Sequence, residues 1–191
     1  MNPTNLITNI RKHVHLGEDE ILVLEKSVKC TVLEKNEFIL KEGQVCQSMY
    51  FVEKGCLRMY FINKRLSEQI TQFAIENWWL SDYFSFMNKS HSDYYIQAIE
   101  KSKILTIDSH IYDELLIEMP QLEKYFRIIM QKAVAASQHR AKLQYQMSKE
   151  EFYQHFVASF PDFNQRVPQY MIASYLGLTP EYVSELRKKK L

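Results

Sequence analysis

The chain has 191 residues, of which 46% are hydrophobic, 13% aromatic and 25% charged. A chain of this length and composition can bury a core and is not compositionally disordered, so we expect a globular protein of one or two domains. The four glycines are not spaced as G-x-G-x-x-G or G-x-x-x-x-G-K, which disfavours Rossmann and nucleotide-hydrolysing proteins.

Cysteine usage and hydropathy restrict the location of the chain. Cys30, Cys46 and Cys56 are odd in number and lack C-x-x-C spacing, which argues against a disulfide framework and a zinc ribbon. No run approaches 18 apolar residues, and residues 1–11 lack the apolar core of a signal peptide. We therefore expect a cytoplasmic protein with reduced thiols and with no membrane partner, metal site or cofactor.

Charge is unevenly distributed along the chain, although the net charge is only +1. Residues 1–119 contain 13 Lys and Arg against 17 Asp and Glu, whereas residues 120–191 contain 11 against 6. We therefore expect the basic residues 120–191, rather than the acidic residues 1–119, to bind a polyanion. The alternative is a chance asymmetry of solvated surface charge.

Residues 29–108 carry short runs of β-branched and aromatic residues with a period of two, which predicts an all-β domain. In residues 48–62, two apolar runs are joined at Gly55, where a tight hairpin is predicted. Further strands are expected at 69–75, 94–99 and 104–107. This pattern favours a sandwich or jelly-roll over an α/β sheet.

A heptad-like stripe follows in residues 120–147 and predicts one long helix. Its members are spaced alternately four and three apart: Leu122, Phe126, Ile129, Ala133, Ala136, Arg140, Leu143 and Met147. We interpret the stripe as a homodimer seam, with the two alanines allowing close approach. The alternative is a helix packed on its own β-domain. Arg140, the one charged member, either extends to solvent at a frayed end or marks where the seam meets an effector.

Two further helices are predicted from their end signals. Ser148 and Glu151 form a capping box, so a helix is expected from there to about Phe160. Pro161 is expected to stop that helix, and Pro168 to open the next one at its first position.

Residues 168–187 predict a helix-turn-helix with a three-residue turn at 177–179. Gly177 suits a left-handed helix end, and Thr179 suits an N-cap followed by Pro180. Apolar positions for a shared core are Ile172, Ala173, Leu176, Leu178, Val183 and Leu186. The alternative is an ordinary αα-hairpin that binds no DNA.

The outer face of the second helix is the predicted DNA-reading surface. Glu181 and Glu185 suit the amino group of cytosine, and the basic run after Leu186 suits phosphates. The DNA-binding residues that we predict are Thr179, Glu181, Tyr182, Ser184, Glu185, Arg187, Lys188 and Lys189.

The chain resembles the Crp/Fnr (catabolite-activator-type) family of bacterial transcription regulators. The resemblance rests on residues 40–44, 50–58, 78–86 and 96–100, followed by the stripe and the helix-turn-helix. It implies an α+β fold in three parts: a cyclic-nucleotide-binding-like jelly-roll at 1–119, a dimerisation helix at 120–147 and a DNA-binding unit at 148–191.

Departures from the family pattern limit what the resemblance implies. Where cyclic-AMP-binding members carry Gly-Glu and Arg-Ser/Thr pairs, this chain has Ser81-Asp82 and Ser92-Asp93. Losing the arginine removes a phosphate fork, so cyclic AMP is not the expected ligand. Three scattered cysteines do not supply an iron–sulfur site. Pro180 and Glu185 stand where members carry arginine, and the chain is expected to lack a full wing.

These observations together predict a homodimeric, non-enzymatic transcription regulator that binds double-stranded DNA and responds to an unidentified small molecule. The predicted effector pocket consists of Ser81, Asp82, Ser92, Asp93 and Arg140. The predicted dimer seam consists of Leu122, Phe126, Ile129, Ala133, Ala136 and Leu143. The alternative function is a ligand-sensing or protein-interaction dimer of the same fold with weak or no sequence-specific DNA binding.

Overall fold

The computed structural model describes residues 3–188, and these residues divide into two compact units. The first unit comprises residues 1–61 and 72–130, and the second comprises residues 62–71 and 131–191. The chain therefore contributes to the second unit twice, once from a strand in the middle of the β region and once from its C-terminal part.

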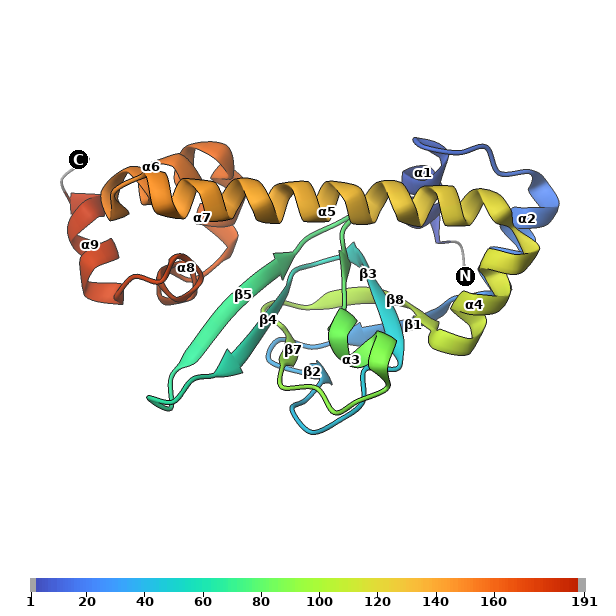
Figure 1. Cartoon of the computed structure of the whole chain (residues 1–191), viewed down its shortest axis with the longest axis horizontal. Helices are drawn as coiled ribbons and strands as arrows, with labels where there is room; N and C mark the ends of the chain where they lie inside the picture. Colours follow the sequence, from blue (N-terminus) through green and yellow to red (C-terminus); the bar gives the residue numbers. More distant parts are fainter. Residues whose placement is uncertain (1–2, 189–191) are drawn as a thin grey trace. The chain divides into compact units, whose positions relative to one another are not determined.

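The first unit contains two helices, eight strands and two further helices before the long helix begins (Figure 1). Their bounds are α1 Thr4–Arg11, α2 Glu18–Ser27, β1 Lys29–Leu33, β2 Phe38–Leu40, β3 Ser48–Lys54, β4 Leu57–Ile62, β5 Glu68–Ala74, β6 Trp79–Leu80, α3 Tyr83–Asn88, β7 Tyr95–Ala98, β8 Ser102–Asp108 and α4 Ser109–Glu118. Strands β4 and β5 each run past the boundary into the second unit.

Two four-stranded sheets form, with the orders β1-β8-β3-β6 and β2-β7-β4-β5. Strand β8 pairs antiparallel with both β1 and β3, and Tyr50 of β3 lies opposite Thr106. This arrangement confirms the predicted α+β class with a β-sandwich of the jelly-roll kind. It also shows why β-branched and aromatic residues dominate residues 29–108, since such side chains fit a pleated, buried surface.

The predicted hairpin at Gly55 is wrong in one respect. Strands β3 and β4 join through this glycine, but they belong to different sheets and do not pair with each other. Gly55 has a φ of 105°, and a Cβ there would lie 2.7 Å from the Ser102 Cα. The sequence signal for a tight turn was correct, but the chain uses the turn to pass from one sheet to the other.

Alternating residues of β3 face two different cores. Met49 and Phe51 belong to a cluster with residues from α1, α2, α4 and the start of α5. Tyr50 and Val52 belong to a second cluster between the two sheets. Both faces of the strand are buried, which explains why this stretch reads as a continuous apolar run rather than as an alternation.

The long helix α5 spans Pro120–Gln146, which confirms the predicted helix. After it come α6 Lys149–Ser159, α7 Pro161–Arg166, α8 Gln169–Leu176 and α9 Pro180–Lys188. Ser148 and Glu151 form the predicted capping box, with the Ser148 hydroxyl accepting from the Glu151 amide. Pro161 ends α6 as expected, but it also opens the short helix α7, which was not predicted.

We expect Gly55→Ala to destabilise the first unit much more than Gly43→Ala. Gly43 also has a positive φ, of 82°, but a Cβ there meets nothing within 4 Å. The Gly43 variant should therefore lose only the backbone strain of about 1 kcal/mol, whereas the Gly55 variant adds a steric clash and should lose about 3 kcal/mol or more. Urea unfolding followed by the fluorescence of Trp78 and Trp79 measures both, and equal losses would contradict this account.

Candidate nucleic-acid interface

Hydrogen bonds at the turn between α8 and α9 satisfy backbone groups at the end of α8 and at the start of α9. Gly177 is left-handed, with a φ of 69°. The Leu178 amide donates to the Ala173 carbonyl at 2.9 Å and the Gly177 amide donates to the Ser174 carbonyl at 3.2 Å, which is the Schellman pattern. On the other side, the Thr179 hydroxyl accepts from the Tyr182 amide at 3.2 Å and so caps α9.

A small apolar core fixes the two helices against each other. Its members are almost fully buried: Met171, Ile172, Ala173, Leu176, Val183 and Leu186. Ala173 has no exposed surface, which fits a position where only a small side chain allows the helices to cross. Leu178, which was also predicted for this core, is half-buried. Pro168 precedes α8 as its N-cap residue, one position before the predicted place.

The outer face of α9 is polar and carries both signs of charge. The exposed side chains are Glu181, Ser184, Glu185, Arg187 and Lys188, and Tyr182 is half-buried. Thr179 is exposed, but its hydroxyl already serves as the cap. Lys189, the last of the predicted DNA-binding residues, lies outside the described residues.

Arg187 differs from Lys188 in that the chain already supplies it with a partner. With the Gln169 amide oriented so that its oxygen faces the guanidinium, Arg187 Nε donates to this oxygen at 2.9 Å. The contact joins the end of α9 to the start of α8. Lys188 is therefore the better candidate for a mobile phosphate contact, and Arg187 also has a structural role.

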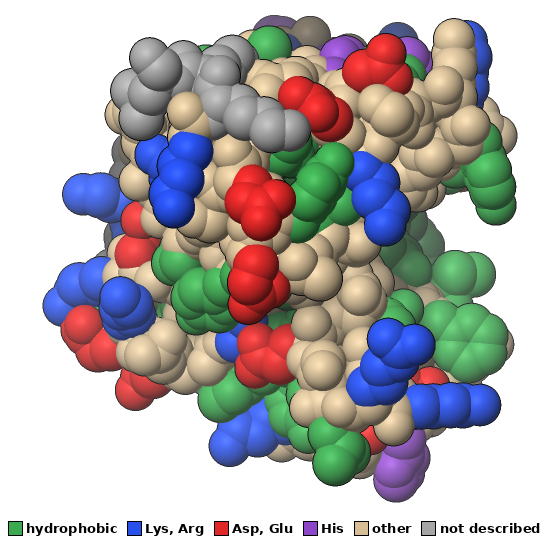
Figure 2. All heavy atoms as spheres, turned by 90° about the vertical axis from the view of Figure 1, so that its left-hand side faces the viewer, with side chains coloured by type: hydrophobic (Ala, Val, Ile, Leu, Met, Phe, Trp, Pro, Cys, Tyr) green, Lys and Arg blue, Asp and Glu red, His purple; other side chains and the backbone are tan. Residues whose placement is uncertain are grey.

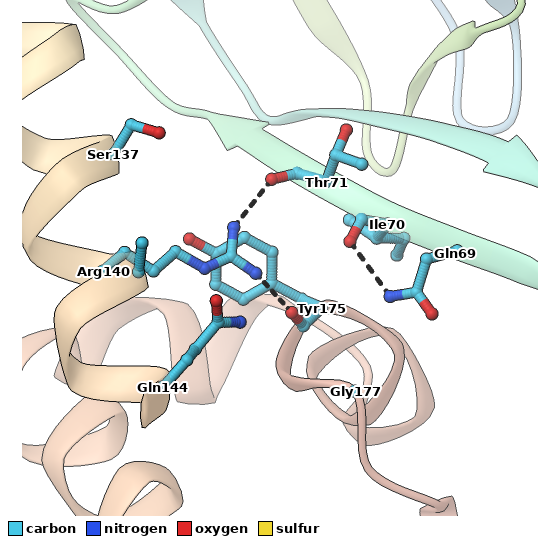
Figure 3. Close-up of a pocket in the computed structure, with 9 residues that line it drawn as sticks. Gln69, Ile70, Thr71, Ser137, Arg140, Gln144, Tyr175 and Gly177 are labelled. Carbon is cyan, nitrogen blue, oxygen red and sulfur yellow. Dashed lines mark hydrogen bonds between the residues drawn. The ribbon is translucent and has the colours of Figure 1, made fainter. Parts of the chain in front are cut away.

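Arg140 holds the C-terminal end of α8, a contact that was not predicted. Its Nη2 donates to the Tyr175 carbonyl at 2.6 Å, and its Nη1 donates to the Thr71 carbonyl at 2.9 Å. The guanidinium also lies 3.7 Å from the centre of the Tyr175 ring (Figure 3). A cation at the end of a helix satisfies unpaired carbonyls and opposes the helix dipole.

Residues 68–71 add a second set of contacts to α8. The Ser174 hydroxyl donates to the Glu68 carbonyl at 2.7 Å and accepts from the Ile70 amide at 3.0 Å. The Gln69 side-chain amide donates to the Ser174 carbonyl. Short polar residues such as Ser174 give no sequence signal for a contact with a strand about a hundred positions earlier, so these residues could not be found from the sequence.

The predicted effector pocket is not assembled as expected. The Asp82 carboxylate caps α3, accepting from the Phe84 and Ser85 amides at 3.1 and 3.2 Å, and it also accepts from the Ser92 hydroxyl at 2.7 Å. Asp82 and Ser92 do meet, but their polar atoms satisfy each other. Ser81 is likewise buried, and its hydroxyl donates to the Ser48 carbonyl at 3.1 Å.

The other two residues of that predicted pocket have different surroundings. Asp93 is exposed. Arg140 belongs to the second unit, where it donates hydrogen bonds to the carbonyls of Thr71 and Tyr175. It does not extend freely into solvent, because these carbonyls and the Tyr175 ring hold it.

Comparisons with known proteins agree with this architecture. Residues 30–118 match the family described as "Cyclic nucleotide-binding domain". The chain is 28% identical over 183 residues to the Regulatory protein HlyX of Actinobacillus pleuropneumoniae, which covers 90% of this chain and 75% of that protein. It is 25% identical over 183 residues to the Fumarate and nitrate reduction regulatory protein of Escherichia coli (strain K12), covering 90% and 72%. The comparisons thus confirm the predicted resemblance to Crp/Fnr-type transcription regulators.

A solved structure shows the same fold. FixK2 from Bradyrhizobium japonicum matches this chain with a TM-score of 0.72 and 16% sequence identity, over 85% of this chain and 83% of that one. At this identity the likeness concerns the fold alone. The two relatives named above are both regulatory proteins, as their names state.

The predicted dimer seam of this regulator does not have one environment along its length. Leu122 and Phe126 are buried in the core of the first unit, and Ile129 packs against that core. The heptad spacing at this end of α5 therefore reflects packing on the chain's own β-domain, which was the alternative reading. Ala133 and Ala136 are exposed, and Leu143 is buried within the chain itself.

Residues 3–188 contain no group of three or more His, Cys, Asp or Glu side chains arranged to hold a metal ion. Among the helices of that same stretch, none is both long and apolar enough to cross a membrane.

We expect Arg140→Met to loosen the end of α8. Methionine keeps much of the aliphatic bulk but removes the hydrogen bonds to the Thr71 and Tyr175 carbonyls, so the local opening free energy of residues 172–178 should fall by about 1–2 kcal/mol. Native-state hydrogen exchange measures this value. Lys142→Met, which changes an exposed charge on the same helix, is the control. Equal protection in both variants would show that Arg140 does not anchor α8.

Proposed function

We propose that this chain is a homodimeric transcription regulator that inserts the outer face of α9 into the major groove of double-stranded DNA. The observation that carries the proposal is the geometry of α8 and α9, in which a closed turn, a capped start and a shared core present one polar helix face to solvent. Such a pair of helices suits groove recognition because the second helix is rigid and its outer side chains are free to meet base edges.

Side-chain chemistry suggests how the tasks divide on α9. The carboxylates of Glu181 and Glu185 suit the exocyclic amino group of cytosine, which is a donor in the major groove. Ser184 and Lys188 suit phosphate oxygens, which position the protein without reading sequence. Tyr182, Arg187 and Lys189 complete the proposed DNA-facing set, together with the backbone at Thr179.

Charge on the surface predicts that binding depends on a small number of phosphate contacts. The face shown in Figure 2 carries acidic side chains among the basic ones rather than one continuous basic patch. The two glutamates of α9 add repulsion toward the DNA backbone, so sequence-independent affinity should be low. A regulator of this kind would gain specificity from cytosine contacts and from two-site binding as a dimer.

The middle of α5 is the proposed dimer contact. Residues 131–139 of this helix are exposed, and they include the small residues Ala133 and Ala136. Two copies of the helix meeting here would cover these side chains, and small residues would let the backbones approach closely. Of the predicted seam, Ala133 and Ala136 thus remain in the proposal.

We further propose three functional parts. They are an effector-sensing β-domain at 1–119, a dimerisation helix at 120–147 and a DNA-binding part at 148–191. The effector is not cyclic AMP, because Ser92 and Asp93 stand in place of the arginine-containing phosphate fork. In this proposal the protein acts by binding rather than by catalysis, and it acts in the cytoplasm.

Lys188→Ala should weaken DNA binding and make it less dependent on salt. Each lost phosphate contact reduces the steepness of the plot of log K against log salt by about 0.9 per subunit. Fluorescence anisotropy with labelled fragments enriched from a genomic pool, measured at several salt concentrations, gives affinity and slope together. Lys149→Ala removes the same charge at the start of α6 and should leave both unchanged. Binding that is indifferent to salt, or equally affected by the two variants, would count against the proposal.

Ala136→Glu should convert a dimer into a monomer. A carboxylate at a close helix contact would be buried against its own copy, and like charges there repel. Ala135→Glu places the same charge on another face of the helix and should leave the dimer intact. Sedimentation equilibrium distinguishes a particle of 22.8 kDa from one of twice that mass. A wild-type chain that is monomeric at micromolar concentration would contradict the dimer.

A second candidate function is a dimer of the same fold that senses a ligand or contacts proteins with weak or no sequence-specific DNA binding. The observation that favours it is the mixed charge of α9, with Glu181 and Glu185 both exposed. The anisotropy experiment separates the two functions, because this candidate predicts that no fragment of the genomic pool is selectively retained.

A further inference from the structure

An open pocket of about 450 Å³ lies within the second unit, and Arg140 is the one lining residue that was also placed in the predicted effector pocket. Three segments line it: the strand segment that precedes Gln72, the C-terminal half of α5, and the end of α8 (Figure 3). The lining residues are Gln69, Ile70, Thr71, Ser137, Arg140, Ala141, Gln144, Tyr175 and Gly177. A volume of this size is in the range of small-molecule sites.

Among the described residues that line the pocket, Arg140 alone is charged. Its guanidinium lies against the Tyr175 ring, and burial lowers the pKa of this group. None of the nine lining residues is acidic, so no carboxylate within the pocket balances the positive charge. The electrostatic environment therefore favours an anion and disfavours a cation.

The guanidinium also has unused hydrogen-bonding capacity. Of its five N–H donors, one on Nη1 and one on Nη2 are directed to the carbonyls of Thr71 and Tyr175. The Nε atom is buried and has no hydrogen-bond partner. Nε and a neighbouring Nη together form the planar fork that binds carboxylate and phosphate groups with two parallel hydrogen bonds. The side chains of Ser137 and Gln144 stand on the same wall of the pocket (Figure 3).

We propose that this pocket binds a small organic oxyanion, either a phosphate ester or a carboxylate, with Arg140 as its charged contact. The oxyanion accepts hydrogen bonds from the N–H groups of Arg140 that are not directed to the two carbonyls. The hydroxyl of Ser137 and the amide of Gln144 supply neutral polar contacts. Asp82 and Ser92, which were expected to hold the effector, are not among the residues that line this pocket.

The site would couple the ligand to DNA recognition, and this consequence rests on the function proposed above. An anion that binds while Arg140 keeps its bonds to Thr71 and Tyr175 restrains the guanidinium. The restrained guanidinium then holds the last turn of α8, and the closed turn transmits this restraint to α9. Ligand binding should therefore increase the hydrogen-exchange protection of residues 172–178.

The test uses the side-chain ¹⁵N–¹H spectrum of the full chain, in which each arginine Nε–H gives its own signal. Ribose 5-phosphate and pyruvate are titrated separately, with sodium chloride at matched ionic strength as the blank. We expect the Arg140 signal, identified by its loss in Arg140→Lys, to shift saturably with at least one of the two anions and not with chloride. The two probes distinguish phosphate esters from carboxylates.

A matched pair of variants tests the site without removing Arg140. Ser137→Asp places a carboxylate one helical turn from Arg140 and should weaken binding of the same probe at least tenfold, because it competes for the guanidinium. Ala135→Asp adds the same charge on another face of α5 and should leave the affinity within twofold. If Arg140→Lys fails to fold, this pair alone decides the question, with hydrogen exchange of residues 172–178 as its readout.

The proposal is overturned if neither anion gives a saturable response, or if both aspartate variants weaken binding equally. Neither measurement involves DNA. If no anion binds, the DNA-binding proposal is still tested by the salt-dependent anisotropy measurement. If the chain does not bind DNA, the anion site is still tested by the titration.

Discussion

Strand β3 buries both of its faces, because Met49 and Phe51 pack against helices while Tyr50 and Val52 pack against the second sheet. The helical layer on the outer face includes the first turns of α5. There the Tyr125 hydroxyl accepts from the Trp79 indole at 2.8 Å and donates to the Asn9 side chain at 2.7 Å. The start of the long helix is therefore part of the core of the β-domain. The same helix continues beyond Met130 into the second unit.

Local signals allowed the helix-turn-helix to be predicted from the sequence. Gly177, Thr179 and the capping box at Ser148 each act over three or four residues, and their side chains or backbone angles are used as the sequence suggested. The strands of the sandwich could also be predicted, because the alternation that marks a strand is a local sequence signal as well. The pairing partner of each strand is not a local property, so the turn at Gly55 was assigned to a hairpin when it connects two sheets.

Periodicity identified the long helix but not what covers each part of it. A residue spaced for a heptad seam is equally spaced for a core, and Leu122 and Phe126 belong to the core of their own unit. Arg140 was singled out because it interrupts the apolar stripe. Its actual partners, Thr71 and Tyr175, are 69 and 35 positions away, and no spacing rule connects them. Asp82, which was predicted for the effector pocket, caps α3 and accepts a hydrogen bond from the Ser92 hydroxyl, and the resemblance did not suggest this role.

The second unit is assembled from two stretches that the whole first-unit segment 72–130 separates in sequence. Ser174 depends on the backbone of Glu68 and Ile70 for its hydroxyl contacts. A gene fragment that encodes only the C-terminal helices would thus produce α8 without the strand that satisfies its polar groups. Exchange of DNA-binding modules between proteins of this fold has to transfer residues 68–71 together with the helices, or supply a matching strand from the recipient.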